Sequence, residues 1–115
     1  MTILVTGASG GLGKSLFPLI QARHSNHLVV KTSRSGDDLK VCDLTDKSAV
    51  DNLIRLVKPK IIFHLAATFT GDFDTDFKTN VVAFQNICDS LIEQDLASRV
   101  IVFGSAAEYG VIHPN

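Results

Sequence analysis

Short runs of apolar residues recur along the chain and predict buried β-strands. Residues 3–5, 28–30, 61–63 and 100–103 are apolar without a break, and none of these runs alternates with polar positions. Uninterrupted runs of this kind are typical of parallel strands that are covered on both faces of a sheet. We therefore expect strands at residues 2–6, 28–33, 39–42, 60–66 and 98–104.

The stretches between these runs carry apolar residues at helical spacing and predict helices over residues 11–24, 46–57 and 76–94. In the second helix, Thr45 or Asp46 can cap the start. Pro59 ends that helix, because the residue before a proline is pushed out of the helical region. The apolar positions are Val50, Leu53, Ile54 and Val57 in the second helix, and Phe77, Val81, Phe84, Cys88 and Leu91 in the third.

The alternation of strands and helices predicts the fold class. Strands that alternate with helices form a parallel sheet with helices on both faces. We expect an α/β, doubly wound parallel sheet, and a length of 115 residues suits a single domain.

Composition narrows the classes of partner. Of the 115 residues, 45% are hydrophobic and 20% charged, and the net charge is −1, so there is no basic excess to neutralise nucleic-acid phosphates. No apolar run approaches the roughly 20 residues that cross a bilayer, which favours a cytoplasmic protein without membrane contact. Cys42 and Cys88 lack the spacing of a metal or redox pair, and we interpret both as small structural residues.

The first predicted strand leads directly into a glycine-rich loop, residues 7–13, and a helix follows at once. In this context Gly7 allows a tight turn, and Gly10 or Gly11 lets the backbone approach a pyrophosphate. Gly13 lets the helix pack closely on the strand. The backbone amides at the start of the helix favour a bound phosphate, so the loop predicts a dinucleotide site.

Residues 8–15 also fit a relaxed phosphate-binding P-loop that ends in Gly-Lys-Ser. In that alternative Lys14 would reach the β- and γ-phosphates, and Ser15 would hold Mg²⁺. A P-loop enzyme needs a further acidic residue after a buried strand, and only Asp43 could serve. We therefore favour a solvated Lys14 on the helix and keep an ATP-binding P-loop as an alternative.

Thr6, Gly7, Gly10 and Gly13 match the pattern Thr-Gly-x-x-Gly-x-x-Gly, and in this the chain resembles the short-chain dehydrogenase/reductase superfamily. Only eight residues separate Arg34 from Asp43, which favours the extended branch, the nucleoside-diphosphate-sugar epimerases and dehydratases. In the single-domain branch a helix usually lies there. Further matches are Asp43-Leu44-Thr45-Asp46, His64-Leu65-Ala66-Ala67, Asn80 and Ser105-Ala106-Ala107-Glu108-Tyr109-Gly110.

The resemblance implies a Rossmann-like sheet with strand order 3-2-1-4-5. It also implies that residues 1–115 form an NAD(P)-binding domain that lacks the later strands and the substrate-binding part of a complete enzyme.

The resemblance further implies a role for most of these residues. Asp43 and Leu44 would lie near the adenine ring, and the segment after His64 would line the cofactor. Asn80 would either join the site or bond a neighbouring backbone, and His64 is expected to be a core histidine with its hydrogen bonds satisfied. The expected cofactor-binding residues are Gly7, Ser9, Gly10, Gly11, Leu12, Gly13, Ser33, Arg34, Asp43, Leu44, Leu65, Ala66, Ala67 and Asn80.

The end of the second strand bears on the choice of cofactor. NAD-binding members of the superfamily place an acidic residue there for the ribose hydroxyl, whereas this chain has Ser33 followed by Arg34. A carboxylate would repel the additional phosphate of NADP, and a guanidinium can pair with it. We therefore expect NADP rather than NAD, with a solvated Arg34 as the alternative.

Ser105 stands where the extended branch has its catalytic serine or threonine. The superfamily's acid/base is a tyrosine with a lysine four residues later, but Tyr109 is the only tyrosine here and is followed at that distance by His113. We therefore expect cofactor binding and no turnover from these residues alone. The complete parent would be an NAD(P)-dependent epimerase, dehydratase or reductase of a nucleotide sugar or similar hydroxyl or carbonyl substrate.

Two further hypotheses concern the function and the oligomeric state of the protein. A non-enzymatic module that senses NADP would use the glycine loop and Arg34 but would have no use for Ser105. The resemblance also implies a possible homodimer through the helix at residues 76–94.

Overall fold

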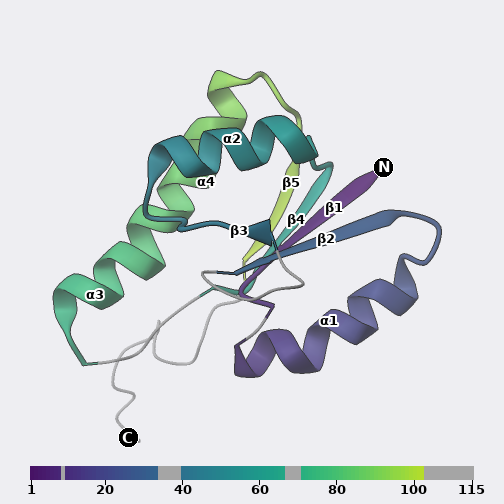
Figure 1. Ribbon diagram of the computed structural model, residues 1–115, viewed down its shortest axis with the longest axis horizontal. Coiled ribbons are helices and arrows are strands. Elements are labelled where there is room, and N and C mark those ends of the chain that lie inside the picture. Colours follow the sequence, from purple (N-terminus) through teal and green to yellow (C-terminus); the bar gives the residue numbers. More distant parts are fainter. Residues whose placement is uncertain (9, 34–39, 67–70, 103–115) are drawn as a thin grey trace, which may run out of the picture.

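Five parallel strands form one sheet in the order β3-β2-β1-β4-β5, as predicted (Figure 1). The computed structural model describes residues 1–8, 10–33, 40–66 and 71–102. The strands expected at residues 60–66 and 39–42 are shorter in the structure, where residues 60, 65, 66 and 42 lie outside the strands. The strands are β1 (Thr2–Thr6), β2 (Leu28–Ser33), β3 (Lys40–Val41), β4 (Ile61–His64) and β5 (Arg99–Val102).

The central strand β1 explains why the apolar runs are uninterrupted. It pairs in parallel with β2 on one side and with β4 on the other, so that Ile3 lies opposite both Val29 and Ile61. Ile3, Leu4 and Val5 are fully buried. Because successive side chains point to opposite faces, a strand buried on both faces needs apolar residues at every position.

Helices cover both faces of the sheet, and each face has its own core (Figure 1). Helix α1 (Gly11–Arg23) lies on one face, where Ile20 packs with Ile3 and Val5. Helices α2 (Lys47–Val57) and α4 (Ala83–Glu93) lie on the other. The buried residues of that second core are Leu4, Cys42, Leu44, Val50, Leu53, Ile54, Val57, Ile62, Ala83, Ile87 and Leu91.

Helix α2 begins and ends where its sequence predicts. Asp46 is the N-cap, and its carboxylate accepts hydrogen bonds from the backbone amides of Ser48 at 3.0 Å and Ala49 at 3.4 Å. Lys58 ends the helix in the left-handed conformation, with φ at 47°, and Pro59 follows. Two strong local signals therefore define this helix independently of its packing.

The helix expected at residues 76–94 differs from the prediction. It begins earlier, as α3 (Phe73–Phe77), because Asp72 caps the Thr75 amide, and it passes through a π-helical segment, η1 (Lys78–Val82), into α4. The stripe that faces the core also differs, since Phe77 and Val81 are 46% and 44% exposed. The buried positions of α4 are Ala83, Ile87, Ser90 and Leu91.

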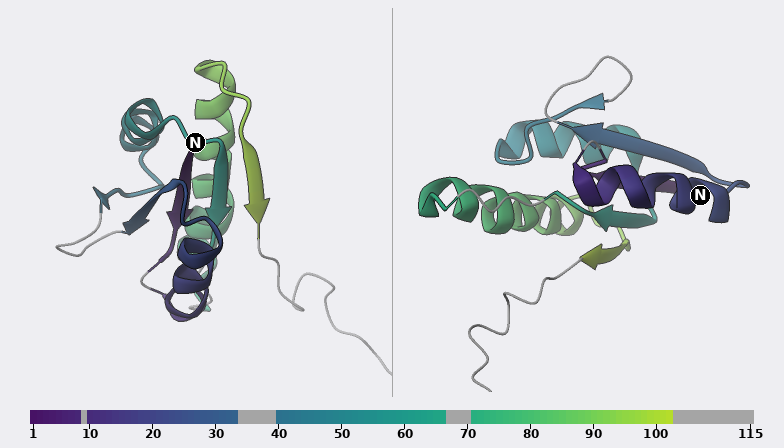
Figure 2. Two further views of the ribbon diagram at one scale, coloured as in Figure 1. Left: turned by 90° about the vertical axis from the view of Figure 1, so that its right-hand side faces the viewer. Right: turned by 90° about the horizontal axis from the view of Figure 1, so that it is seen from below.

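Strand β5 forms one edge of the sheet, next to β4 (Figure 2). Its pairing with β4 places Val102 opposite His64, at the carboxyl ends of the strands. No helix in the described part of the chain is long and apolar enough to cross a membrane.

Candidate functional site

The glycine loop lies at the carboxyl edge of the sheet, where β1 ends against β4. Gly7 adopts a positive φ of 69°. A Cβ at this position would lie 2.5 Å from the Ala66 backbone nitrogen and 2.7 Å from the backbone carbon of Leu65. Because no side chain can fit there, glycine at position 7 lets the loop touch the segment that follows β4.

Two further glycines of the loop, Gly10 and Gly13, have different surroundings. A Cβ on Gly13 would lie 2.0 Å from the Gly7 carbonyl oxygen, so the first turn of α1 packs directly on the loop. Among the described residues, a Cβ on Gly10 would meet only the Gly7 oxygen, at an ordinary 3.5 Å, and Gly10 has a φ of −74° that any residue adopts. The fold thus requires glycine at positions 7 and 13 but has room for a side chain at position 10.

The N-terminus of α1 is suited to an anion. Gly10 is the N-cap and supplies no side-chain hydrogen bond, and the first turn contains no acidic residue. The Gly10 amide donates to the Gly7 carbonyl at 3.1 Å, which closes the turn before the helix. The first amides of a helix and its dipole together favour negative charge at such an end.

A buried polar pair joins the ends of β1 and β4. Thr6 Oγ1 lies 2.7 Å from His64 Nδ1 and accepts a weaker bond from the Ala66 amide at 3.4 Å. The Leu65 amide donates to the Thr6 carbonyl at 3.1 Å. These contacts hold the segment after β4 against the strand that leads into the glycine loop.

His64 was expected to have its hydrogen bonds satisfied, and this is only half correct. The side chain is 5% exposed, yet Nε2 has no hydrogen-bond partner in the structure as described. Its ring instead lies 5.8 Å from that of Phe84, centroid to centroid. Burial lowers the pKa of His64, which favours the neutral ring.

The turn after β3 carries Asp43 and Leu44. Asp43 is exposed and its Oδ1 accepts bonds from the Thr45 amide at 3.0 Å and the Thr45 hydroxyl at 2.7 Å, whereas Leu44 is buried. Asn86 of α4 donates to the Leu44 carbonyl at 2.9 Å. Sequence reasoning missed Asn86, because its neighbours on the helix, such as Ser90 and Glu93, are also polar and no local signal distinguishes it.

The two cysteines have the surroundings of structural residues. Burial raises the pKa of the Cys42 thiol, and the neighbouring carboxylates of Asp43 and Asp46 add to the effect. Burial and Asp89 likewise raise the pKa of Cys88. Both thiols therefore stay protonated at neutral pH, which makes them poor nucleophiles and metal ligands.

Several expected site residues cannot be compared with the structure. Ser9, Arg34, Ala67 and Ser105 lie outside the described residues, and for Gly11, Leu12 and Ser33 only the backbone, in α1 and β2, is described. Asn80 lies half-buried in η1 and interacts with other groups. The residues that the structure brings into one place are Gly7, Gly10, Gly13, Leu65 and Ala66.

Comparison with known proteins agrees with this architecture. The sequence model of the NAD dependent epimerase/dehydratase family matches residues 3–115. The chain belongs to this family. A relative from Aggregatibacter actinomycetemcomitans, GDP-6-deoxy-D-talose 4-dehydrogenase, is 31% identical over an alignment of 115 positions. The match covers 96% of this chain and 37% of the relative.

A second relative is dTDP-L-rhamnose 4-epimerase from Burkholderia thailandensis. It is 30% identical, and the match covers 94% of this chain and 35% of the relative. The chain of 115 residues thus spans a little over a third of the length of these curated relatives.

Solved structures share the fold at lower identity. UDP-glucose 4-epimerase from Thermus thermophilus, solved with NAD, has a TM-score of 0.69 and 22% identity over 84% of this chain and 35% of that one. Uronate dehydrogenase from Agrobacterium tumefaciens has a TM-score of 0.74 and 21% identity over 90% of this chain and 40% of that one. At these identities the likeness shows the Rossmann-like fold.

Proposed function

We propose that this chain is the dinucleotide-binding part of an NAD(P)-dependent epimerase, dehydratase or reductase that acts on a nucleotide sugar. The observation that carries the proposal is the contrast between the glycines of the loop. Packing within the fold explains why positions 7 and 13 are glycine. Gly10 lies at the uncapped start of α1, and a Cβ there would meet no described atom closer than 3.5 Å. A bound pyrophosphate would account for the missing side chain at position 10.

A pyrophosphate at the start of α1 would determine which part of the cofactor each of the other expected residues contacts. The glycine loop and the first turn of α1 would hold the pyrophosphate, while Asp43 and Leu44 would bind the adenine end. Leu65, Ala66, Ala67 and Asn80 would line the remainder of the cofactor. When bound, the nicotinamide supplies hydride transfer, and the apolar Leu65 with the closely packed loop would keep water from its ring.

Replacing Gly10 with serine tests the proposal, because serine is a favoured N-cap and the position has room for it. We expect Gly10→Ser to keep the melting temperature of the parent but to weaken binding of NADPH or NADH at least about tenfold, equivalent to about 1.4 kcal/mol. Isothermal titration with NADPH, NADH and ATP measures this directly. If the parent binds ATP but neither NADPH nor NADH, and Lys14→Ala abolishes the binding of ATP, the P-loop alternative is supported instead.

For the choice of cofactor we favour NADP, because Ser33 and Arg34 stand where a carboxylate would select NAD. Arg34→Ala should weaken NADPH binding and leave NADH binding nearly unchanged. Equal losses for both cofactors would show that Arg34 does not contact the additional phosphate.

In the whole protein, Ser105 is the proposed hydrogen-bond donor to the substrate oxygen. This oxygen gains or loses a proton when hydride is transferred from or to the nicotinamide. Ser105→Ala in the longest available gene product should abolish turnover and preserve cofactor binding. A protein that merely senses NADP would keep its function in this variant.

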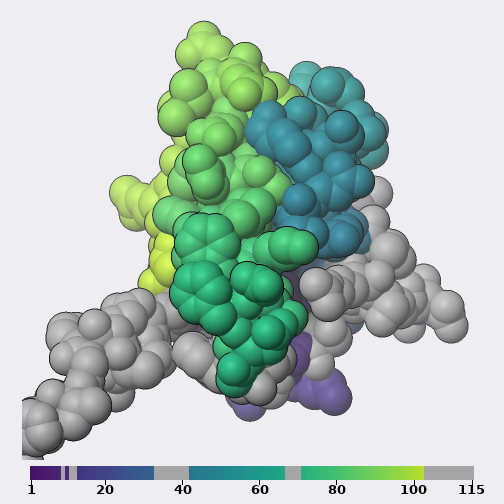
Figure 3. Space-filling view, turned by 90° about the vertical axis from the view of Figure 1, so that its left-hand side faces the viewer, coloured from purple at the N-terminus to yellow at the C-terminus, as the bar shows by residue number. Residues whose placement is uncertain are grey.

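A homodimer through the surface of α3, η1 and α4 is also part of the proposal. These elements form a continuous column on the face shown in Figure 3. Phe73 is 76% exposed and stacks on Phe77 at 5.7 Å between ring centroids, and Val81 follows on the same helix. Exposed apolar surface of this kind is typical of protein contacts.

Light scattering after gel filtration tests the dimer. Phe77→Ser should shift the chain towards the mass of a monomer, whereas Leu56→Ser should not, although Leu56 is 75% exposed on α2. An unchanged mass in both variants would exclude this face as the contact.

A further inference from the structure

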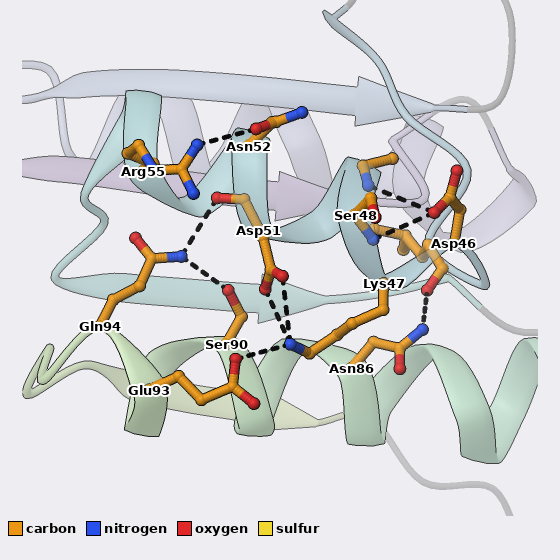
Figure 4. Close-up of polar contacts among 12 residues, drawn as sticks. Asp46, Lys47, Ser48, Asp51, Asn52, Arg55, Asn86, Ser90, Glu93 and Gln94 are labelled. Carbon is orange, nitrogen blue, oxygen red and sulfur yellow. Dashed lines mark hydrogen bonds and ion pairs between the residues drawn. The ribbon is translucent and has the colours of Figure 1, made fainter.

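Helix α4 reaches across to the turn that follows β3 through a single amide side chain. Asn86 lies half-buried, and its Nδ2 donates to the Leu44 carbonyl oxygen at 2.9 Å (Figure 4). The two residues are 42 positions apart in the chain. The bond therefore joins helix α4 to the turn that carries Asp43.

Local bonds give this turn its shape. The Asp46 amide donates to the Asp43 carbonyl at 3.0 Å, and the Asp43 carboxylate accepts from the Thr45 amide and hydroxyl. Such bonds move with the turn and do not determine where it lies relative to the rest of the molecule. The bond from Asn86 does, because α4 is packed on the sheet through Ala83, Ile87 and Leu91.

We propose that Asn86 is a positioning residue for the adenosine end of the dinucleotide. The proposal rests on the proposed function, in which Asp43 and Leu44 bind the adenine. Asn86 does not touch the ring in this account. It holds the Leu44 carbonyl, and with it the Asp43 side chain and the neighbouring amides, at the carboxyl edge that the glycine loop shares.

A second amide, on the residue that caps the C-terminus of α4, provides a matched control. Gln94 Nε2 donates to the Asp51 carbonyl of α2 at 3.1 Å and lies 2.8 Å from Ser90 Oγ (Figure 4). Like Asn86, it is a half-buried amide that joins α4 to the segment before or within α2. Unlike Asn86, it bonds to the helix rather than to the turn, away from the expected ligand.

The experiment compares Asn86→Ala, Asn86→Asp and Gln94→Ala in the full chain, with calorimetric titration of ADP-ribose and of its phosphorylated form derived from NADP. Asn86→Asp keeps the size of the side chain but removes the donor, so it separates the hydrogen bond from packing. We expect both Asn86 variants to bind the better of the two ligands about fivefold more weakly, the effect of one lost hydrogen bond of about 1 kcal/mol. Gln94→Ala should lower the melting temperature to a similar extent and bind as the parent does.

Each other outcome overturns the inference in a distinguishable way. Equal losses of affinity in all three variants would show that Asn86 contributes only to general stability. Parent affinity in both Asn86 variants would show that the bond to Leu44 does not position the site. If the parent chain binds neither ADP-ribose compound nor NADPH, the proposed function itself fails, and the inference fails with it.

Discussion

The two faces of the sheet are covered in different ways. On one face α1 is the one helix in the described part of the chain. It begins without a side-chain cap and packs through a small cluster around Ile20. On the other face α2 and α4 lie together over the larger core, and polar bonds connect them (Figure 4). Lys47 of α2 pairs with Asp51 at 2.9 Å and with Glu93 of α4 at 2.7 Å.

This difference indicates that one face contributes mainly to stability and that the other is better suited to bind an anion. A helix whose first amides are already capped is poorly suited to an anion, and Asp46 occupies that place in α2. Gly10, the N-cap of α1, provides no such cap, and an uncapped helix start favours an anion. We therefore expect substitutions on the α2 and α4 side to change stability, and substitutions at the start of α1 to change binding.

The largest expected effect compares one isoleucine from each core. Ile54 of α2 is fully buried and Ile20 of α1 is 8% exposed. We expect Ile54→Ala to lower the free energy of unfolding by about 4 kcal/mol and Ile20→Ala by about 2 kcal/mol. The cost rises with the volume of the cavity that remains, and the neighbours of Ile54 in the larger core have less freedom to fill it. Urea unfolding measures both, and equal losses would contradict the comparison.

The second effect concerns the loop between the faces. Gly7→Ala should cost about 3 kcal/mol, because it combines a positive φ with a clash against the Ala66 backbone, and it should abolish dinucleotide binding. Gly71 is a suitable control, since its φ is also positive but a Cβ would meet no atom of the described residues within 4 Å. Gly71→Ala should therefore cost only about 1 kcal/mol and leave binding intact. Similar losses from the two variants would show that the backbone contact is unimportant.

The third effect is a dependence of stability on pH. Burial lowers the pKa of His64 below its ordinary 6.5, so below that pH the unfolded chain binds a proton that the folded chain does not. Stability should therefore fall as the pH drops from about 7 towards the pKa of the folded state, by at most about 1.4 kcal/mol per pH unit. His64→Gln keeps a polar partner for Thr6 and should flatten this slope in urea unfolding. An unchanged slope would assign it to other groups.

The smallest effect concerns the cap of α2. Asp46→Ala should cost about 1 kcal/mol, because it leaves the amides of Ser48 and Ala49 without their acceptor. Asp46→Asn should stay within a few tenths of a kcal/mol, roughly the scatter among good caps. Thermal unfolding followed by circular dichroism measures both, and a stable Asp46→Ala variant would show that the cap is dispensable.

The strands and the glycine loop could be predicted because their signals are local. An apolar run such as Ile3-Leu4-Val5 identifies a strand that is buried on both faces, and the strand order followed from the resemblance. The course of the third helix could be predicted only in part. Its apolar residues occupy more than one stripe, so their spacing predicts a helix without showing that Ala83 and Ile87 meet the sheet while Phe77 and Val81 do not.

The sequence by itself determined the order of the elements, the limits of α2 and the positions where glycine is needed. These features depend on neighbouring residues, on a cap or on the conformational freedom of one residue. Only the tertiary structure decided that His64 has one hydrogen-bonded nitrogen, that Asn86 meets Leu44, and that Gly10 is free of the contacts that constrain Gly7. Such contacts join residues that are distant in the chain, and they exist only once the helices have packed on the sheet.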